Sequence, residues 1–299
     1  MSRKILFFIN PIAGNKKELH LEKRIIRACE KRNAGFEILF TSKEGDYNFL
    51  HEKIKTDFIT DIVICGGDGS IRQIIASVLK MPVNIGIIPL GSGNGLARTA
   101  GIPKSINKAL KNIFEGKPVL VDAFMINDQL SCHVSGLGFD ARVAHIFSRR
   151  KTRGLNTYTK IALSEFLSAR TYSFEIKIDK NNFSVEAFLV CIANSNQFGN
   201  NFKIAPKANI CDGLLDIVIL KKTSKAEIVL AFVKQLFAGN IQEITSKDVE
   251  KKNILYFQTN KIIIKNHQLA PLHVDGDPLQ SAEHFSVEIL PSAYNLICP

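Results

Sequence analysis

The sequence contains no tryptophan in 299 residues, and its acidic side chains are fewer than its basic ones. There are 28 Asp and Glu against 39 Lys and Arg, so the formal net charge is +11. An excess of positive charge occurs in proteins that bind nucleic acids, anionic membranes or phosphorylated compounds. Because zinc-finger spacing and an RNP-like aromatic motif are also missing, we expect no nucleic-acid partner.

Long apolar segments are missing as well. The longest uncharged stretch, residues 81–97, is interrupted by Pro82, Pro89 and four glycines, which argues against a membrane span. The apolar run at residues 5–9 is too short for the core of a signal peptide. We therefore expect a cytoplasmic protein.

The cysteines form no metal-binding or disulfide pattern. There are six of them without a CxxC pair, and most lie inside apolar runs. We predict reduced core thiols, because disulfide frameworks and zinc sites need paired cysteine spacing.

The first 120 residues alternate between apolar runs and helical spacing. Strands are predicted at residues 4–9, 36–40, 61–65 and 83–88, and helices at 21–29, 47–54, 71–79 and 105–114. This alternation is typical of an α/β domain in which helices cover both faces of a parallel sheet.

From about residue 119 strand patterns dominate. Strands are predicted at 174–178, 185–192, 214–220, 254–258, 261–264, 272–274 and 285–290, and helices at 141–147, 159–167 and 225–237. A chain of this length suits two domains of about 150 residues each. We therefore expect a second domain that is β-rich and mostly antiparallel.

Three glycine-containing turns follow predicted strands of the first domain, at residues 10–14, 66–70 and 91–95. Ligands bind beyond the carboxyl ends of the strands in such sheets. Glycines let backbone N–H groups approach phosphate oxygens, and a following helix adds positive potential. Asp68 suits this setting if Mg²⁺ or a substrate hydroxyl separates it from the phosphates. The turns predict a nucleotide-phosphate site.

Several nucleotide and hydrolase motifs are excluded. The P-loop pattern GxxxxGK[ST] is absent, and the dinucleotide pattern GxGxxG fails at Leu96. Neither GxSxG nor HExxH occurs, which disfavours α/β-hydrolase and zinc-protease chemistry.

The order NPIAG, GGDGS and PLGSGNGLAR resembles the catalytic domain of the diacylglycerol kinase and sphingosine kinase family. The resemblance continues through SGLGFDA at 135–141, the segment 204–217 and VDGDP at 274–278. GGDG alone also occurs in NAD kinases and phosphofructokinases, so the later motifs make the likeness specific. It implies an ATP- and Mg²⁺-dependent kinase that phosphorylates a hydroxyl of diacylglycerol or a similar lipid. It also implies an ATP-binding domain at 1–123, completed by 289–299, and a lipid-binding domain at 124–288.

The resemblance assigns roles to individual residues. The ATP site it implies consists of Asn10, Pro11, Ile12, Ala13, Gly14, Thr41, Gly66, Gly67, Asp68, Gly69, Ser70 and Ser92. Asp68 would hold catalytic Mg²⁺ or orient the acceptor hydroxyl. Asp277 would accept the proton of that hydroxyl where bacterial relatives carry a glutamate. Because aspartate is one methylene shorter, Asp275 or Asp68 would share the task unless the backbone approaches more closely.

A structural Mg²⁺ site is implied at Asp212, with the main-chain carbonyls of Asn209 and Leu214 as further ligands. One carboxylate with carbonyls and water is a suitable oxygen shell for a hard cation. On its own, the Asp212–Gly213 pair also reads as an ordinary turn.

The sequence departs from the family pattern in three places. Arg72 and Gln73 stand where relatives carry Asn and Glu, Gly95 replaces an Asp, and Asp277 replaces the glutamate. These changes leave the acceptor open between diacylglycerol and sphingosine. They also leave open the alternative of a non-catalytic nucleotide-binding regulator. An NAD kinase is disfavoured because a TPTGSTA-type stretch is absent.

Basic residues gather in a run at 149–153, with Lys160 beyond it, and in smaller pairs at 16–17, 221–222 and 251–252. Each basic residue near an anionic bilayer adds about 1 kcal/mol of attraction. We expect the run at 149–153 to attach the protein peripherally to a membrane that carries its lipid substrate. A homodimer is among the assemblies that the sequence leaves open.

Overall fold

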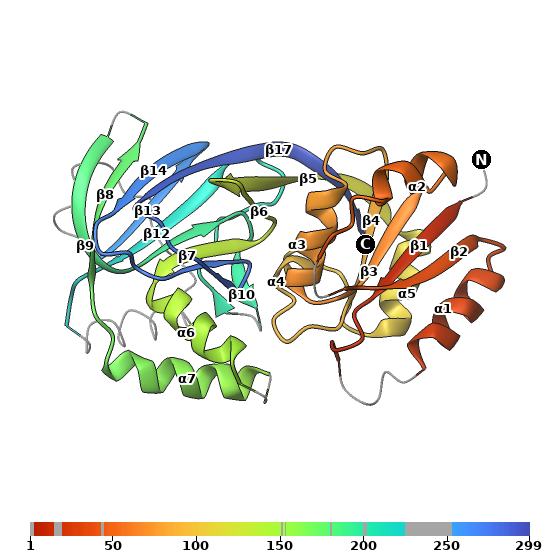
Figure 1. Ribbon diagram of the computed structural model, residues 1–299, viewed down its shortest axis with the longest axis horizontal. Coiled ribbons are helices and arrows are strands. Elements are labelled where there is room, and N and C mark those ends of the chain that lie inside the picture. Colours follow the sequence, from red (N-terminus) through yellow and green to blue (C-terminus); the bar gives the residue numbers. More distant parts are fainter. Residues whose placement is uncertain are drawn as a thin grey trace. The chain divides into compact units, whose positions relative to one another are not determined.

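The chain forms two units, which Figure 1 shows in sequence colours. The computed structural model describes residues 3–14, 20–42, 45–150, 152, 154–179, 181–199, 202–224 and 253–299. The N-terminal unit contains Met1–Asp122 and Ser292–Pro299, and the C-terminal unit contains Ala123–Pro291. The helix predicted at 225–237 and the basic pairs at 16–17 and 251–252 lie outside the described residues.

A parallel sheet forms the centre of the N-terminal unit. Its strands are β1 (Lys4–Ile9), β2 (Gly35–Phe40), β3 (Asp61–Gly66) and β4 (Asn84–Pro89), in the order β2-β1-β3-β4. The last part of β17 (His284–Cys298) adds to β4 in parallel. Every residue of β3 is buried, because helices cover both faces of the sheet.

The helices divide between the two faces, as Figure 1 shows. On one face lie α1 (Leu21–Glu30) and α5 (Ile106–Glu115), whose apolar residues form one cluster with alternate residues of β1 and β3. The other face carries α2 (Leu50–Thr56) and α3 (Asp68–Ser77). The short α4 (Gly95–Thr99) follows β4.

The last residues of the chain are tied into the N-terminal unit. The backbone N–H of Ser292 donates to Asp122 Oδ1 at 2.7 Å. The buried side chain of Asn112 donates through Nδ2 to the Ile297 carbonyl at 3.0 Å. These bonds fix the end of β17 beside β4.

The C-terminal unit is built from antiparallel strands. Besides β17 and β5 (Lys117–Ile126), which both cross the boundary between the units, its strands are β6 (Gln129–Ser131), β7 (Val134–Gly138), β8 (Tyr172–Ile178), β9 (Asn181–Ala193), β10 (Gln197–Gly199), β11 (Phe202–Lys203), β12 (Leu215–Lys221), β13 (Ile254–Thr259), β14 (Lys261–Asn266), β15 (Leu272–Val274) and β16 (Asp277–Leu279). The main path runs β16-β15-β7-β9-β8-β14-β17, and β12 joins β9 to β13.

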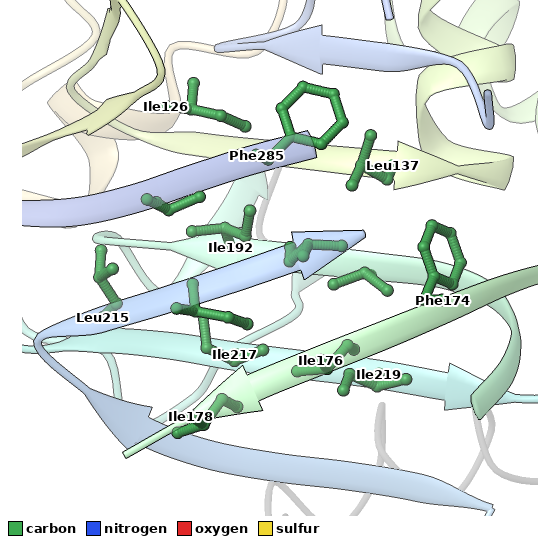
Figure 2. Packing of buried hydrophobic residues seen from close by; sticks show 14 of the residues in the cluster. Ile126, Leu137, Phe174, Ile176, Ile178, Ile192, Leu215, Ile217, Ile219 and Phe285 are labelled. Carbon is green, nitrogen blue, oxygen red and sulfur yellow. The ribbon is translucent and has the colours of Figure 1, made fainter. Parts of the chain in front are cut away.

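Alternate residues of these strands supply two apolar clusters. Figure 2 shows side chains of β7, β8, β9, β12 and β17 together in the larger one. The opposite faces of β9 and β12 contribute to the second cluster. Phe139 of α6 (Phe139–Ser148) and Phe166 of α7 (Leu155–Leu167) pack against that cluster.

The predicted fold class, an α/β domain followed by an antiparallel β-rich domain, is confirmed. Several details differ. Helix α3 begins at Asp68, three residues before its predicted start, so the glycine motif forms its first turn. Helix α4 and strands β5 to β7, β10, β11 and β16 were not predicted. Strand β17 joins the run predicted at 285–290 to the C-terminal segment that the resemblance assigned to the first domain. Within the described part of the chain, no helix combines the length and apolar character needed to cross a bilayer.

Candidate functional site

The carboxyl edge of the parallel sheet gathers the three predicted turns. The backbone N–H of Asn10, after β1, donates to the Cys65 carbonyl, and that of Leu90, after β4, donates to the Gly66 carbonyl, both at 2.9 Å. Strand β1 lies between β2 and β3, so the direction of the strand order reverses between β1 and β3. Ligands of open α/β sheets bind at such a switch point.

Asn10 and Ser70 join the first turn to the second. Asn10 Nδ2 donates to Ser70 Oγ at 2.8 Å, and Asn10 Oδ1 accepts the N–H of Ile12 at 3.0 Å. A Cβ atom at Gly66 would lie 2.9 Å from the Cβ of Ser70. Glycine at this position therefore lets α3 begin directly beneath the end of β3.

The second and third turns touch through their glycines. A Cβ atom at Gly91 would lie 2.6 Å from the Cα of Gly67 and 2.7 Å from Asn94 Oδ1. Asn94 is buried and left-handed, with φ 51°. Its side chain accepts the N–H of Gly91 at 2.8 Å and donates to the Gly91 carbonyl at 2.7 Å. We call residues 66–70 and 91–95 together the glycine cradle.

Asp68 also links the two halves of the glycine cradle. Its carboxylate accepts the backbone N–H of Gly95 at 3.2 Å and that of Leu96 at 3.4 Å. These amides open α4, where a negative charge is favourable. Gly95, one of the departures from the family pattern, thus supplies an amide donor to Asp68. The role of Asp68 toward Mg²⁺ stays a prediction.

The described residues contain no group of three or more His, Cys, Asp or Glu side chains that would enclose a metal ion. Mg²⁺ at phosphate-transfer sites commonly takes one or two carboxylates and completes its shell with phosphate oxygens and water. A single carboxylate such as Asp68 beside a phosphate cradle fits that donor set.

The other predicted residues of the ATP site lie around this edge. Thr41 follows β2, and its N–H donates to the Ile9 carbonyl at 2.9 Å. Ile12 and Ser92 are exposed, as are Pro11 and Gly14, whereas Ala13 is half-buried. Gly69 stands in the first turn of α3.

Asp277 lies in the C-terminal unit, at the start of β16. It follows a two-residue turn in which Asp275 (φ 51°) and Gly276 (φ 85°) are both left-handed. Positive φ at both positions is characteristic of a type I′ hairpin, which the Asp-Gly sequence favours. Asp277 is half-buried and pairs with Val274 across the hairpin.

Asp275 holds this hairpin in place. Its buried carboxylate accepts the hydroxyl of Ser131 at 2.7 Å and the N–H groups of Cys132 at 2.9 Å, His133 at 3.0 Å and Val134 at 3.2 Å. A buried carboxylate engaged by this many donors is a structural brace. Because these donors already occupy the buried Asp275 carboxylate, the structure does not support the expectation that Asp275 shares in proton transfer.

The predicted structural Mg²⁺ segment contains two side-chain-to-backbone turns. Asn209 Oδ1 accepts the N–H of Cys211 at 3.2 Å, and Asp212 Oδ1 accepts the N–H of Leu214 at 3.0 Å. Gly213, which lies between Asp212 and Leu214, is left-handed, with φ 71°. Asn209 and Asp212 are exposed. An aspartate oxygen that accepts one N–H keeps further lone pairs, so the segment remains chemically suitable for a hard cation.

Two other predictions concern surface and core chemistry. Arg149 and Arg150 are exposed after α6, while Lys151 and Arg153 lie outside the described residues. The prediction of core thiols holds for Cys29, Cys65, Cys132 and Cys191, which are buried, but not for Cys211, which is exposed, or Cys298, which is half-buried. Burial raises the pKa of Cys29 to about 11, and burial with the charges of Asp140 and Asp216 raises the pKa of Cys191. Such thiols are poor nucleophiles.

Residues 4–126 match the diacylglycerol kinase catalytic domain, and residues 133–298 match the YegS C-terminal NAD kinase beta sandwich-like domain. A protein of Shewanella frigidimarina named "Probable lipid kinase YegS-like" is 30% identical over 303 residues, covering 98% of this chain and 94% of the relative. The chain belongs to the diacylglycerol kinase and YegS-like lipid kinase family.

Other relatives of this lipid kinase agree with that assignment. A diacylglycerol kinase of Bacillus subtilis is 26% identical over 276 residues, covering 90% of this chain and 88% of the relative. The crystal structure of a diacylglycerol kinase from Bacillus anthracis is 22% identical and has a TM-score of 0.75, covering 99% of this chain and 97% of the other. That likeness shows the shared fold.

Sequence reasoning missed two parts of the lipid kinase that the structure makes evident. Asn94 fastens Gly91, and the signal for it was the Asn-Gly pair, which favours left-handed backbone. The buried pair of Asp140 and His273 comes from positions 133 residues apart, so no local pattern indicates it.

Proposed function

We propose that this lipid kinase transfers the γ-phosphoryl group of ATP to a hydroxyl of diacylglycerol or a related long-chain lipid. The observation that carries the proposal is the glycine cradle at the carboxyl edge of the parallel sheet, beside the switch point between β1 and β3. There the Gly67–Gly91 contact brings two turns together without side chains between them. Such turns leave room for phosphate oxygens to meet backbone N–H groups.

Asp68 is the residue to which we assign the catalytic cation. Mg²⁺, when bound, would neutralise the charge of the phosphates and of the transferred group. The cradle amides and the start of α3 would orient the phosphates. Asp212, with the carbonyls of Asn209 and Leu214, is assigned a second Mg²⁺ that stabilises the C-terminal unit.

Asp277 is assigned as the proton acceptor. As the lipid hydroxyl oxygen bonds to the γ-phosphorus, its proton passes to the Asp277 carboxylate. The bond between the γ-phosphorus and the bridging oxygen breaks, and ADP leaves with that oxygen. The hairpin supports this role because its turn residues fix the backbone on which Asp277 stands.

The acceptor must be reached at a membrane surface. The exposed Arg149 and Arg150 support attachment to an anionic bilayer. Sphingosine is the alternative lipid. An NAD kinase is the second candidate function, because the matched C-terminal family is described as NAD kinase beta sandwich-like.

The test is a transfer assay with γ-labelled ATP and Mg²⁺. Micelles carrying diacylglycerol, sphingosine or monoacylglycerol are incubated separately, with NAD in parallel. We expect label in diacylglycerol. Label in NAD alone would overturn the lipid assignment, and no label anywhere would favour a nucleotide-binding regulator.

Asp277→Asn tests the proton acceptor. We expect kcat to fall about 10²- to 10⁴-fold while ATP affinity stays unchanged, because only proton transfer is removed. Asp128→Asn is the matched control, since Asp128 is an exposed aspartate in the turn between β5 and β6. Wild-type turnover of Asp277→Asn would assign the proton acceptor to another group.

A further inference from the structure

A buried histidine in the hairpin that carries Asp277 contacts a buried aspartate of α6. His273 of β15 is 3% exposed and Asp140 of α6 is 4% exposed. His273 Nε2 lies 3.2 Å from Asp140 Oδ2, and His273 Nδ1 accepts the backbone N–H of Gly276 at 3.2 Å. Since Nδ1 accepts, the proton of the neutral ring is on Nε2 and points at the Asp140 carboxylate.

The motif at residues 135–141 shapes the place of Asp140. Strand β15 pairs with β7 so that His273 stands opposite Gly136. A Cβ atom at Gly136 would collide with Asp140 Oδ2, so only glycine leaves room for this carboxylate. The other oxygen of Asp140 accepts the N–H of Ala141 at 2.8 Å in the first turn of α6, where negative charge is favourable.

The contact with Gly276 reaches the residue next to Asp277. Asp275 fastens one side of the turn through Ser131 and neighbouring N–H groups, and His273 fastens the other side. A proton acceptor must lie within hydrogen-bonding reach of its substrate, and a displacement of about 1 Å can cost 10²-fold in rate. The two anchors therefore determine where the Asp277 backbone stands.

We propose that Asp140 and His273 are positioning residues for Asp277: Asp140 selects the ring tautomer, and His273 Nδ1 holds the Gly276 N–H. This inference rests on the proposed function of Asp277 as proton acceptor. His273 acts through the turn and not on substrate, because it is buried with both ring nitrogens engaged.

Two substitutions of His273 separate its two bonds. In His273→Asn the side-chain oxygen takes the position of Nδ1, so the Gly276 bond is kept and the Asp140 bond is lost. In His273→Gln the amide takes the position of Nε2, so the Asp140 bond is kept and the Gly276 bond is lost. We expect His273→Gln to lose about 10²-fold in kcat at unchanged KM for ATP, with little loss of stability. His273→Asn should lose stability yet keep kcat within about tenfold of wild type.

The control is His267→Gln, which changes an exposed histidine whose Nε2 contacts Glu175 Oε1 at 2.8 Å. It should leave kcat and stability unchanged. A purely structural role for His273 predicts that kcat per folded molecule is equal in both His273 variants, and that result would overturn the proposal. The proposal would also be overturned if His273→Gln kept the wild-type kcat while Asp277→Asn was inactive. That result would leave the proposed function of Asp277 intact. A wild type that phosphorylates no lipid would overturn both.

Discussion

The contact between Gly67 and Gly91 makes Gly91→Ala the sharpest test of the glycine cradle. The new methyl carbon would lie 2.6 Å from the Cα of Gly67 and 2.7 Å from Asn94 Oδ1. Carbon atoms in contact ordinarily stay about 3.5 Å apart or more, so the two turns must separate by roughly 1 Å. Overpacking of this size costs about 1–3 kcal/mol of unfolding free energy.

The same displacement should weaken nucleotide binding. A charge-assisted hydrogen bond to phosphate contributes about 1.5–3 kcal/mol, and each 1.4 kcal/mol is tenfold in Kd. Losing one such bond should raise the Kd for a non-hydrolysable ATP analogue about 10- to 100-fold, as measured by titration calorimetry. Urea unfolding of the same samples measures the loss of unfolding free energy.

Gly35→Ala is the matched control. Gly35 begins β2 at the opposite edge of the same sheet, and a Cβ atom there would lie 3.7 Å from the nearest atom, an ordinary contact. Gly35→Ala should change neither the Kd for the ATP analogue nor the unfolding free energy. If Gly91→Ala bound the analogue as tightly as wild type at unchanged stability, the close approach of the two turns would have no part in binding.

Three further outcomes are expected. Asp275→Asn should lower the unfolding free energy measured in urea by about 2–4 kcal/mol, because the new amide group presents an N–H to groups that are themselves donors. An unchanged urea midpoint would contradict the structural role of Asp275. Replacing Arg149 and Arg150 by glutamate should weaken binding to anionic vesicles at least about 30-fold in co-sedimentation, because each lost positive charge removes about 1 kcal/mol of attraction. Equal binding would show that these two arginines do not attach the protein to a membrane. The folded state raises the pKa of Cys29 from 9.0 to about 11, so its protonated thiol stabilises the fold below pH 9 and that contribution is lost as pH rises to 11. The stability difference between wild type and Cys29→Ala should therefore fall by about 1.4 kcal/mol per pH unit in this window, and a constant difference would refute it.

Strands buried on both faces were the most predictable elements. The runs of β1 and β3 are apolar at nearly every position, so their bounds follow from composition. Strand β7 was missed because Gly136 and Gly138 indicate a loop. Gly136 is required by the Asp140 carboxylate, and Gly138 is required by the Phe188 carbonyl, which lies far outside any local window of sequence.

The location of the cradle was likewise predictable, since parallel strands bring their carboxyl ends to one edge. Its internal contacts were not. The bonds of Asn94 to Gly91 depend on a single left-handed residue, and the bonds of Asp68 to Gly95 depend on where α3 and α4 begin. Propensity places helix starts only to within a few residues.

The place of β17 in the N-terminal sheet bears on how the protein is made. A nascent chain that has emerged only as far as Asp122 lacks residues 292–299, and therefore presents β4 with an unpaired edge. Such an edge is open to pairing with other chains. The N-terminal unit can therefore be completed only after the whole C-terminal unit has been synthesised. Expression of residues 1–122 alone would leave that edge exposed permanently.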